Sequence, residues 1–529
     1  MTADALQQQV QLQARLIAFL KENRSLWDTN SLTSSDIQQV ETHGATVLLG
    51  QNIALKLKKP VLFDHMDYST PAQRKIFCER ELTLNKKGAP DLYDKIVPIG
   101  QRQDGTFALN GEPPFIDYLV CMRRFPEGSQ MDQVAGTGTF SDELQDALAD
   151  TIAQYHLAAD RVTDIHAVPA FSDVIDQNFL QLDSFHPALL PLEETQNFRQ
   201  ELHASVKHHD ALLVDRIKDN WVRWGHGDLH LQNICVLDGK PMLFDAIEYQ
   251  DAFVISDILY DVSFLLMDLW ERGLRQAANR IFNRYLLSIG WMTTPAELSA
   301  LKLLPFYLAM RAGIRTHVAG NRYLQSETDL QKTGYAQQTK SLFEAAQDYL
   351  HPKPPRLIAI GGYSGSGKST LAANIAPHIG APPGAVRLRS DVVRRRLIGW
   401  DDFSPMPPSA YTPDMSEKTY RLIEESALCL LGAGHSVIMD AVLDRPEDKV
   451  SIENCAQKAG VPFSGLWLDV RKDIMTKRIE SRTNDASDAT TAILEQQLTK
   501  NQNKNNDWAV VNGNGSKEEI TQRALKILL

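Results

Sequence analysis

The sequence predicts a chain of two parts, an α+β region followed by an α/β domain built on a parallel sheet. Short strand-like runs and then long helical stretches occupy the residues up to about 350. The proline-rich segment 351–355 cannot continue a helix, because proline fixes its φ angle and has no amide hydrogen. Beyond this segment, short apolar runs alternate with helical stretches, which is typical of parallel strands joined by crossover helices.

The composition is that of a globular protein with more than one domain. The chain has 529 residues, of which 43% are hydrophobic and 23% are charged, and domains usually have roughly 100–200 residues. The net charge of −11 argues against broad nucleic-acid binding. No apolar run reaches the ~18 residues of a membrane span, and the N-terminus does not resemble a signal peptide. The five cysteines form no CxxC pair, so we expect reduced thiols in a cytoplasmic protein.

The first part, residues 1–350, is expected to contain a helix and short strands near its start and long helices near its end. Hydrophobic periodicity predicts an amphipathic helix over 5–27 and two strands around a polar turn within 46–59. Further elements are expected at 71–87 (helix), 117–123 (strand), 141–158 (helix), 222–249 (short strands around a polar loop) and 256–349 (helical almost throughout).

The second part, residues 356–529, opens with a strand-like run and a glycine-rich loop. The segment Gly362–Ser369 matches the pattern G-x-x-x-x-G-K-[ST] in full. In such a loop the glycines let successive amides surround phosphate oxygens, the lysine reaches the outer phosphates and the serine hydroxyl binds Mg²⁺. The following helix adds its positive N-terminal end. We predict an ATP site formed by Gly362, Tyr363, Ser364, Gly365, Ser366, Gly367, Lys368, Ser369 and Thr370, with Lys368 also catalytic and Ser369 a metal ligand.

Acidic and basic residues downstream are expected to complete this ATP site. Asp440 ends the apolar strand 436–440 and would orient a magnesium-bound water, unless it is an ordinary strand-terminal acid. Asp391 would be the catalytic base or anchor for an acceptor hydroxyl; alternatively it is a helix N-cap, with Ser390 as a rival cap. The arginines 394–396 would bind an anionic substrate or form a solvated helix face, and for Arg395 we favour the solvated face.

Arg478 and Arg482 lie four residues apart on a predicted helix and therefore share a face. They would close over the transferring phosphate as a catalytic lid, or else form charge pairs on a surface helix. Together the segments GGYSGSGKST, RSDVVRRRL, GHSVIMDAVLDR and RIESRTNDASDA resemble the small P-loop kinases of metabolites, the gluconate-kinase, chloramphenicol-phosphotransferase and zeta-toxin group. The resemblance implies a kinase rather than a motor ATPase.

A second set of polar residues lies upstream, within HGDLHLQN at 226–233. Asp228 is followed five residues later by Asn233, and Asp245 comes after a short hairpin. Kinases of the protein-kinase type need this arrangement, because the first acid orients the acceptor hydroxyl while the amide and the second acid hold Mg²⁺. We therefore predict Asp228 as the catalytic base, Asn233 and Asp245 as metal ligands, and His226 as a brace for the loop.

This loop resembles the catalytic loop of aminoglycoside phosphotransferases and of their choline- and homoserine-kinase relatives, and residues 35–350 resemble that family as a whole. The resemblance implies a kinase-like fold of two lobes, with the N-lobe at about 35–122 and the C-lobe at about 123–350. In this fold Lys56, within IALK, contacts the phosphates and pairs with Glu81, with Glu79 as a competitor. It also implies that Val120 and Met122 contact the adenine. The sequence departs from protein kinases, since no G-x-G-x-x-G precedes the lysine and Asp-Ala-Ile replaces the DFG triplet.

Two phosphate-handling residue sets on one chain predict a bifunctional phosphotransferase dependent on ATP and Mg²⁺. Each domain would transfer the γ-phosphoryl group to a hydroxyl of a small molecule, without a nucleic-acid or membrane partner. Two alternatives remain open: one domain is a nucleotide-binding regulatory module, or the C-terminal domain is a toxin-like kinase of a nucleotide sugar. The sequence does not identify the acceptors, because pocket residues rather than the fold decide the substrate.

Overall fold

The computed structural model of the chain describes residues 3–23, 26–27, 37–63, 66–162, 164–400, 404–443, 445–481, 487–500 and 508–529. The chain forms two compact units, the first of residues 1–169 and 216–265 and the second of residues 170–215 and 266–529. The second unit thus joins helices from both sides of the proline-rich segment. Among the described residues, no helix is long and apolar enough to cross a membrane.

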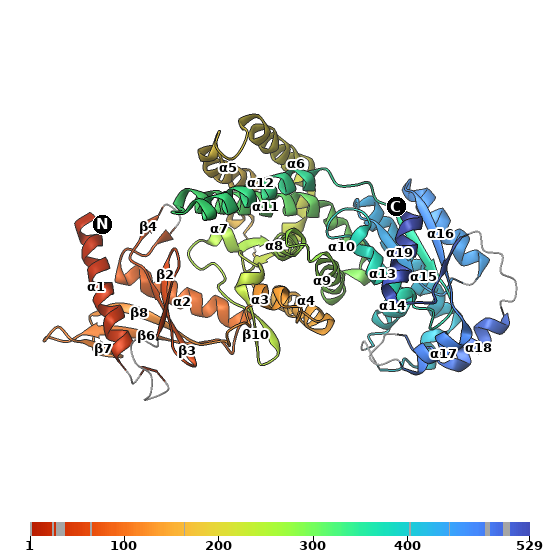
Figure 1. The fold of residues 1–529 in the computed structure, drawn as a ribbon, viewed down its shortest axis with the longest axis horizontal. Coiled ribbons are helices and arrows are strands. Elements are labelled where there is room, and N and C mark those ends of the chain that lie inside the picture. Colours follow the sequence, from red (N-terminus) through yellow and green to blue (C-terminus); the bar gives the residue numbers. More distant parts are fainter. Residues whose placement is uncertain are drawn as a thin grey trace. The chain divides into compact units, whose positions relative to one another are not determined.

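The first unit is built on an antiparallel sheet of six strands in the order β1-β2-β3-β8-β6-β7 (Figure 1). Leu16 and Leu20 of the N-terminal helix pack with Leu48, Leu57 and Leu119 in a core on this sheet. The elements are α1 (Ala3–Glu22), β1 (Gln38–Glu41), β2 (Ala45–Leu49), β3 (Ile53–Lys58), β4 (Leu62–Phe63), β5 (Met66–Asp67), α2 (Pro71–Gly88), β6 (Tyr93–Gln101), β7 (Phe107–Leu109) and β8 (Phe115–Arg123).

The elements predicted for this region are present, with one difference at the first helix. Helix α1 ends at Glu22 rather than near residue 27. The chain turns back there, because the Trp27 indole donates a hydrogen bond to the Leu20 carbonyl (3.0 Å) and joins the core. Helix α2 begins where predicted, since the Thr70 side chain caps it and Pro71 occupies its first turn.

The rest of the first unit consists of short elements around a polar loop, as the sequence predicts for 222–249. Strands β9 and β12 pair antiparallel, as do β10 and β11. The elements are α3 (Met131–Gly136), α4 (Asp142–Ala158), β9 (Val222–Trp224), η5 (Leu231–Asn233), β10 (Ile234–Leu237), β11 (Lys240–Leu243), α7 (Asp251–Val254), β12 (Ile255–Asp257) and α8 (Ile258–Glu271), which continues beyond the unit.

The helices of the second unit that precede the proline-rich segment confirm the helical pattern predicted for 256–349. Helices α11 and α12 run side by side (Figure 1). Gly320 of α11 allows close packing, because a Cβ atom there would lie 2.4 Å from the Phe185 ring. The helices are α5 (Phe171–Leu182), α6 (Leu192–Lys218), α9 (Arg275–Ser288), α10 (Pro295–Leu298), α11 (Leu304–Gln325) and α12 (Asp329–Leu350).

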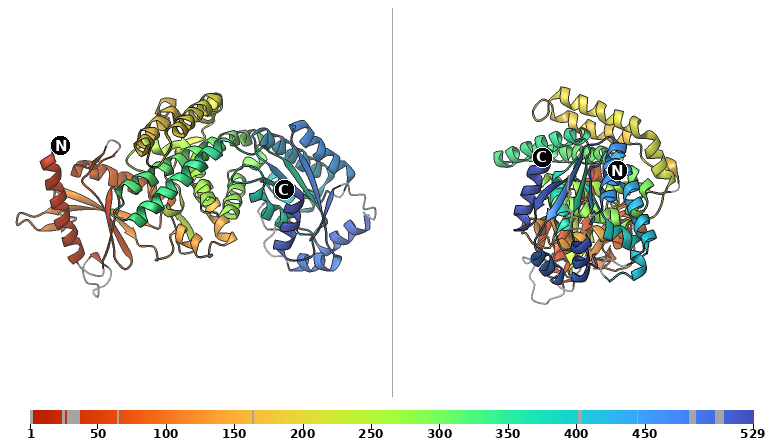
Figure 2. Two further views of the ribbon diagram at one scale, coloured as in Figure 1. Left: turned by 45° about the horizontal axis from the view of Figure 1, so that its top comes forward. Right: turned by 90° about the vertical axis from the view of Figure 1, so that its right-hand side faces the viewer.

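The second unit also contains the predicted parallel sheet, with five strands in the order β14-β15-β13-β16-β17 and helices on both faces (Figure 2). Its central strands are buried on both faces, which explains their continuous apolar runs. The elements are β13 (Leu357–Gly361), α13 (Lys368–Ile375), β14 (Val386–Arg389), α14 (Ser390–Leu397), α15 (Pro413–Gly432), β15 (Val437–Asp440), α16 (Pro446–Ala459), β16 (Phe463–Asp469), α17 (Lys472–Glu480), α18 (Thr491–Lys500), β17 (Ala509–Asn512) and α19 (Lys517–Leu528).

Strand β14 lies at the edge of this sheet, and helix α9 covers its open side. The buried side-chain amide of Asn279 donates hydrogen bonds to the carbonyls of Pro383 and Ala385, both at 3.0 Å. One turn later, the Asn283 amide donates to Ala385 (3.2 Å) and its oxygen accepts from the Arg387 amide (2.7 Å). Asn283 thus bonds β14 itself, and both asparagines bond the residues that lead into this strand, which in turn leads directly to Asp391.

Candidate active sites

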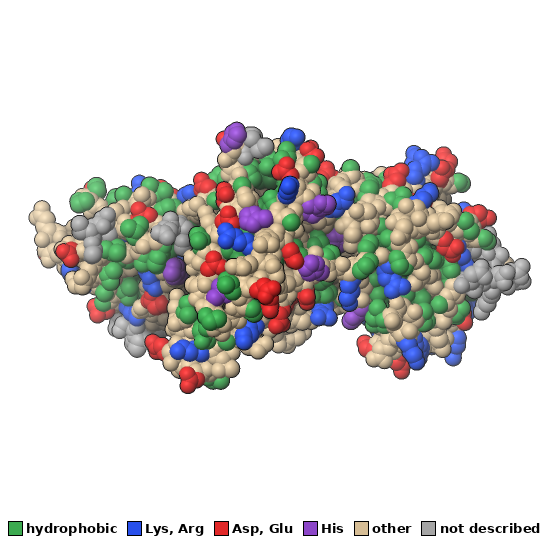
Figure 3. Space-filling view, turned by 90° about the horizontal axis from the view of Figure 1, so that it is seen from above, with side chains coloured by type: hydrophobic (Ala, Val, Ile, Leu, Met, Phe, Trp, Pro, Cys, Tyr) green, Lys and Arg blue, Asp and Glu red, His purple; other side chains and the backbone are tan. Residues whose placement is uncertain are grey.

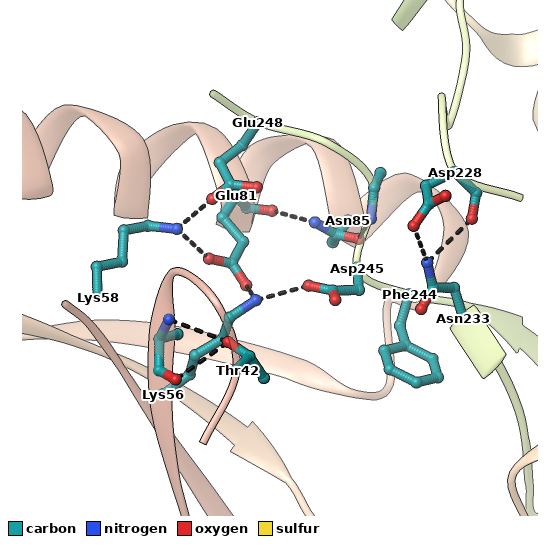
Figure 4. Close-up of polar contacts among 12 residues, drawn as sticks. Thr42, Lys56, Lys58, Glu81, Asn85, Asp228, Asn233, Phe244, Asp245 and Glu248 are labelled. Atoms are coloured by element: carbon teal, nitrogen blue, oxygen red, sulfur yellow. Dashed lines mark hydrogen bonds and ion pairs between the residues drawn. The ribbon is translucent and has the colours of Figure 1, made fainter. Parts of the chain in front are cut away.

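The first candidate site, in the first unit, is centred on Lys56 of β3. Its ammonium lies 2.7 Å from Oε1 of Glu81 on α2 and 2.6 Å from Oδ1 of Asp245 (Figure 4). Glu81 is fully buried, whereas Glu79 is half exposed and lies 3.7 Å from Lys75 on the helix surface. The structure therefore brings Glu81, and not Glu79, to the lysine.

The charges of this site hold one another in their ionised forms. Burial alone lowers the pKa of Lys56, but the carboxylates of Asp245 and Glu81 outweigh it and the pKa is raised. Burial likewise raises the pKa of Glu81, but two neighbouring ammonium groups reverse the effect and lower it. Asp245 has a φ of 62°, a backbone conformation that is uncommon for a residue other than glycine and that occurs often at functional sites.

The predicted catalytic loop places Asp228 and Asn233 together. The Asn233 amide donates to the Asp228 carboxylate (2.8 Å) and to its carbonyl (3.0 Å), across the single turn η5. His226 braces this loop, since its Nε2 lies 2.9 Å from the carbonyl of Phe244, the residue before Asp245. The loop and the segment of Asp245 are therefore tied together, and in Figure 4 the Asn233 amide points to Asp228 while the Asp245 carboxylate points to Lys56.

Asp261 of α8 anchors the same loop, and the sequence reasoning missed this role. Its carboxylate accepts the backbone amides of His226 (2.7 Å) and Gly227 (2.9 Å) and lies 3.2 Å from Nε2 of His156. Asp261 is completely buried. The available signal was a carboxylate inside the most apolar run of the chain, Ile255–Trp270, where an acid must find buried partners.

Val120 and Met122 lie inside β8, directly opposite Lys56 and Ala54 of β3. Opposed residues of an antiparallel pair share a face, so these side chains and the lysine lie on one side of the sheet. Strand β8 is paired on its other edge with β6, Val120 is completely buried in a hydrophobic core, and Met122 is partly buried against the same core. Contact with adenine stays a prediction.

A second lysine, Lys58, enters the first site two residues after Lys56. Its ammonium lies 2.6 Å from Oε2 of Glu81 and also pairs with Glu248. The Tyr68 hydroxyl donates a further hydrogen bond to Glu248. The sequence shows Lys58 only as one charge in an alternating strand, and it gives no sign that this side chain is only 1% exposed.

The second candidate site is the predicted phosphate loop between β13 and α13. The Lys368 ammonium donates to the carbonyls of Gly362 (2.8 Å) and Tyr363 (3.1 Å), so the lysine side chain lies along the loop. Gly365 has a φ of 77°, and a Cβ atom there would lie 2.6 Å from the Met475 carbonyl. Ser364, Gly365, Gly367, Lys368, Ser369 and Thr370 line a cleft of about 270 Å³ together with Asp391 and Asp440.

Two acids line this cleft: Asp440 ends β15, and Asp391 follows the end of the neighbouring strand β14. Asp440 lies 3.4 Å from Nε of Arg389. Burial raises the pKa of Asp391, Arg389 opposes the rise and the charge of Asp440 adds to it. The alternative that Asp391 or Ser390 caps helix α14 is wrong, because the helix starts at Ser390 and its capping residue, Arg389, makes no side-chain cap.

The arginines of α14 have different surroundings, which corrects the expectation of a solvated face for Arg395. Arg395 is 1% exposed and pairs with Asp488 (2.6 Å). Its guanidinium also donates a hydrogen bond to the Ser404 carbonyl (2.6 Å). Arg394 is also buried and donates to the Ala410 carbonyl (2.9 Å) and the Ser416 hydroxyl (3.2 Å).

Arg478 of α17 reaches the phosphate loop although 112 residues separate it from Ser366, whose carbonyl accepts its guanidinium hydrogen bond (2.8 Å). It also donates to the Gly513 carbonyl (3.2 Å). Burial lowers the pKa of Arg478. Arg482, the other predicted lid residue, lies outside the described residues.

Two family models match separate parts of the chain. Residues 112–301 match the phosphotransferase enzyme family, and residues 357–502 match a family described as AAA domain. The chain therefore joins a phosphotransferase-family domain to a P-loop domain, and the fusion predicted from the motifs is confirmed. These matches support an ATP-dependent kinase.

Proteins of two mycobacteria are similar to almost the whole chain, and solved structures are similar to parts of it. Uncharacterized proteins of Mycobacterium tuberculosis and Mycobacterium bovis are 29% identical over 479 residues, which cover 89% of this chain and 91% of each relative. A gluconokinase from Sinorhizobium meliloti is 19% identical and covers 33% of this chain and 91% of its own, with a TM-score of 0.25. A choline/ethanolamine kinase family protein from Mesorhizobium loti is 11% identical and covers 64% and 98%, with a TM-score of 0.36. These similarities assign no activity to the chain.

Proposed function

We propose that the chain is a bifunctional phosphotransferase in which each domain transfers the γ-phosphoryl group of ATP to a hydroxyl of a small molecule. The observation that carries the proposal is that residues distant in sequence meet at two separate sites. Each site combines a lysine for phosphates with a carboxylate for the acceptor and with oxygen ligands of the kind that Mg²⁺ prefers.

At the first site, Asp228 orients the acceptor hydroxyl and takes its proton. Lys56, held by Glu81, binds the phosphates of ATP. The carboxylate of Asp245 and the amide oxygen of Asn233 fit a hard cation, and Mg²⁺ bound there neutralises charge on the phosphates. Asp245 is 44% exposed in its side chain, so a ligand reaches it without unfolding the loop.

At the second site, the loop Gly362–Ser369 and Lys368 hold the phosphates, and Asp391 accepts the proton of the acceptor. The raised pKa of Asp391 favours this role, because a base works best when its pKa approaches the working pH. Ser369 and Asp440 supply the oxygen ligands that suit Mg²⁺. Arg478 stabilises the loop and provides positive charge beside it.

A cavity of about 870 Å³ next to the second site is suited to the acceptor. It shares Arg394, Tyr411 and Tyr420 with the nucleotide cleft. Its lining has three arginines against four carboxylates, and two of the arginines form ion pairs with carboxylates of the same lining. We therefore expect a neutral or zwitterionic acceptor. The apolar part of the lining is Leu388, Ile423, Met439, Leu443 and Ile452.

The proposal is tested by ATP consumption with a panel of hydroxylated metabolites. The full-length chain is compared with Asp228→Asn, Lys368→Ala and the double variant. Each single substitution should remove the phosphorylation of a different acceptor, and the double variant should be inactive. If both single variants retain the parent's turnover with every acceptor, the proposal is wrong. If only one of them loses turnover, the other domain is not a kinase.

A further inference from the structure

Strand β3 directs two lysines to one face of the sheet, and both use the same carboxylate. Residues two apart in a strand share a face, so Lys56 and Lys58 lie side by side. Oε1 of Glu81 lies 2.7 Å from Lys56, and Oε2 lies 2.6 Å from Lys58 (Figure 4). The carboxylate of Glu81 is thus held at both oxygens, and its orientation toward Lys56 depends on Lys58.

Lys58 also connects β3 to the segment that carries Asp245. Its ammonium pairs with Glu248, three residues after Asp245. Glu248 in turn accepts a hydrogen bond from the hydroxyl of Tyr68, which lies just before α2. The Lys58 ammonium lies 4.8 Å from the centre of the Tyr68 ring. Three elements of the first site, namely β3, the approach to α2 and the segment of Asp245, therefore meet at one buried ammonium.

The balance of charges at the first site links Lys58 to the availability of Lys56. Lys56 has two carboxylate partners in the structure, Glu81 and Asp245. To bind phosphate, its ammonium must exchange Asp245 for the nucleotide, while Glu81 remains fully buried and needs compensation. Lys58 supplies that compensation and also neutralises Glu248. Without it, two buried carboxylates would compete with the phosphates for Lys56.

We propose that Lys58 and Glu248 form a positioning pair, which fixes Glu81 and the Asp245 segment so that Lys56 is available to the phosphates of ATP. Neither residue is placed to touch the nucleotide, because their charged groups are buried against each other. The proposal rests on the proposed function of the first site. Partners that orient metal-ligating residues typically change metal affinity or activity by ~10–100-fold when they are mutated, and we expect an effect of the same order here.

The test measures binding of Mg·ATP and of adenosine to the full-length chain by titration calorimetry. Every protein carries Lys368→Ala, so that only the first site binds phosphates. Lys58→Met and Glu248→Gln should each weaken Mg·ATP binding by ~10-fold or more. Adenosine has no phosphates, so its affinity should not change. The double variant, in which both charges are absent, should bind Mg·ATP more tightly than Lys58→Met, and Lys58→Arg should retain most of the affinity.

Lys59→Met is the matched control, because Lys59 follows Lys58 in the sequence and its ammonium pairs at the surface with Glu41 (2.7 Å). It should bind both ligands as the parent does. Unchanged Mg·ATP affinity in Lys58→Met and Glu248→Gln, or an equal loss for adenosine, would overturn the positioning role. If Lys58→Met does not fold, Glu248→Gln and Lys58→Arg decide. A parent that binds adenosine but not Mg·ATP refutes the proposed function itself, and the positioning role with it.

Discussion

Asn279→Ala is expected to loosen the edge strand of the P-loop domain, although the residue precedes that domain by more than 70 positions. The substitution removes two hydrogen bonds, to the carbonyls of Pro383 and Ala385, from a side chain that is 1% exposed. The lost bond to Ala385 costs a net ~0.5–1.5 kcal/mol, and leaving the buried Pro383 carbonyl without its donor costs about 1–3 kcal/mol, which together give about 2–4 kcal/mol. The Ala385 carbonyl keeps the amide of Asn283, so the Pro383 carbonyl bears most of the cost.

The assay is hydrogen exchange of the amides of β14, because a chain of several domains does not unfold in one step and local opening is the relevant quantity. A change of about 2–4 kcal/mol accelerates exchange by roughly 30- to 700-fold where opening limits it. Gln276→Ala is the control, since Gln276 lies on the same helix and donates to the Ala373 carbonyl (3.0 Å) from an exposed position. Equal exchange of β14 in both variants would refute the view that α9 supports this strand.

Three further outcomes follow from the two sites. Asp261→Asn should reduce turnover at the first site by ~10–100-fold, measured in a Lys368→Ala background, because the catalytic loop loses an ionised anchor; unchanged turnover would contradict that role. In an Asp228→Asn background, activity should fall as the pH decreases. The apparent pKa of this fall should lie above the ordinary aspartate value, because the proton-accepting carboxylate of Asp391 has a raised pKa. A pH–rate profile without such a fall would exclude this base. In the same background, neutral polyols should be phosphorylated with a higher kcat/KM than acceptors with two or more negative charges, since carboxylates outnumber arginines in the cavity lining; a preference for polyanions would refute the argument from charge.

Much of the fold could be predicted because the decisive patterns are local. The phosphate loop, the period-2 strand IALKLK and the helical stretches depend on residues near one another in sequence. Residues with one dominant chemistry, such as Lys56, Asp228 and Lys368, could be chosen for the same reason. The structure brings Glu81 to Lys56 and Asn233 to Asp228, whereas Lys368 donates to a carbonyl of its own loop.

The residues that the sequence did not reveal act through distant partners. Lys58 and Asp261 look like a strand lysine and a helix aspartate, and their importance depends on groups 190 and 35 residues away. The expectation of a solvated face for Arg395 is wrong for the same reason, since its guanidinium pairs with Asp488, 93 residues away. Charge patterns on the predicted surface say little about such pairs. Acidic and basic side chains are interspersed over the face shown in Figure 3, and the informative pairs are the buried ones.

The cover that α9 provides for β14 bears on how this chain can be divided. The proline-rich segment 351–355 is a joint between two parts of the sequence, but both sides of it belong to one compact unit. Helix α9, which bonds the residues at the sheet edge, precedes this segment in the sequence. A fragment that begins at residue 356 keeps its phosphate loop and exposes a bare strand, which invites pairing with another copy. Self-association of that fragment, or its toxicity to a cell, would therefore be explained first by the missing helix and only then by an enzymatic activity. By the same reasoning, recombination at this joint would yield a stable protein only if the new neighbour also brought amide side chains to the edge of β14.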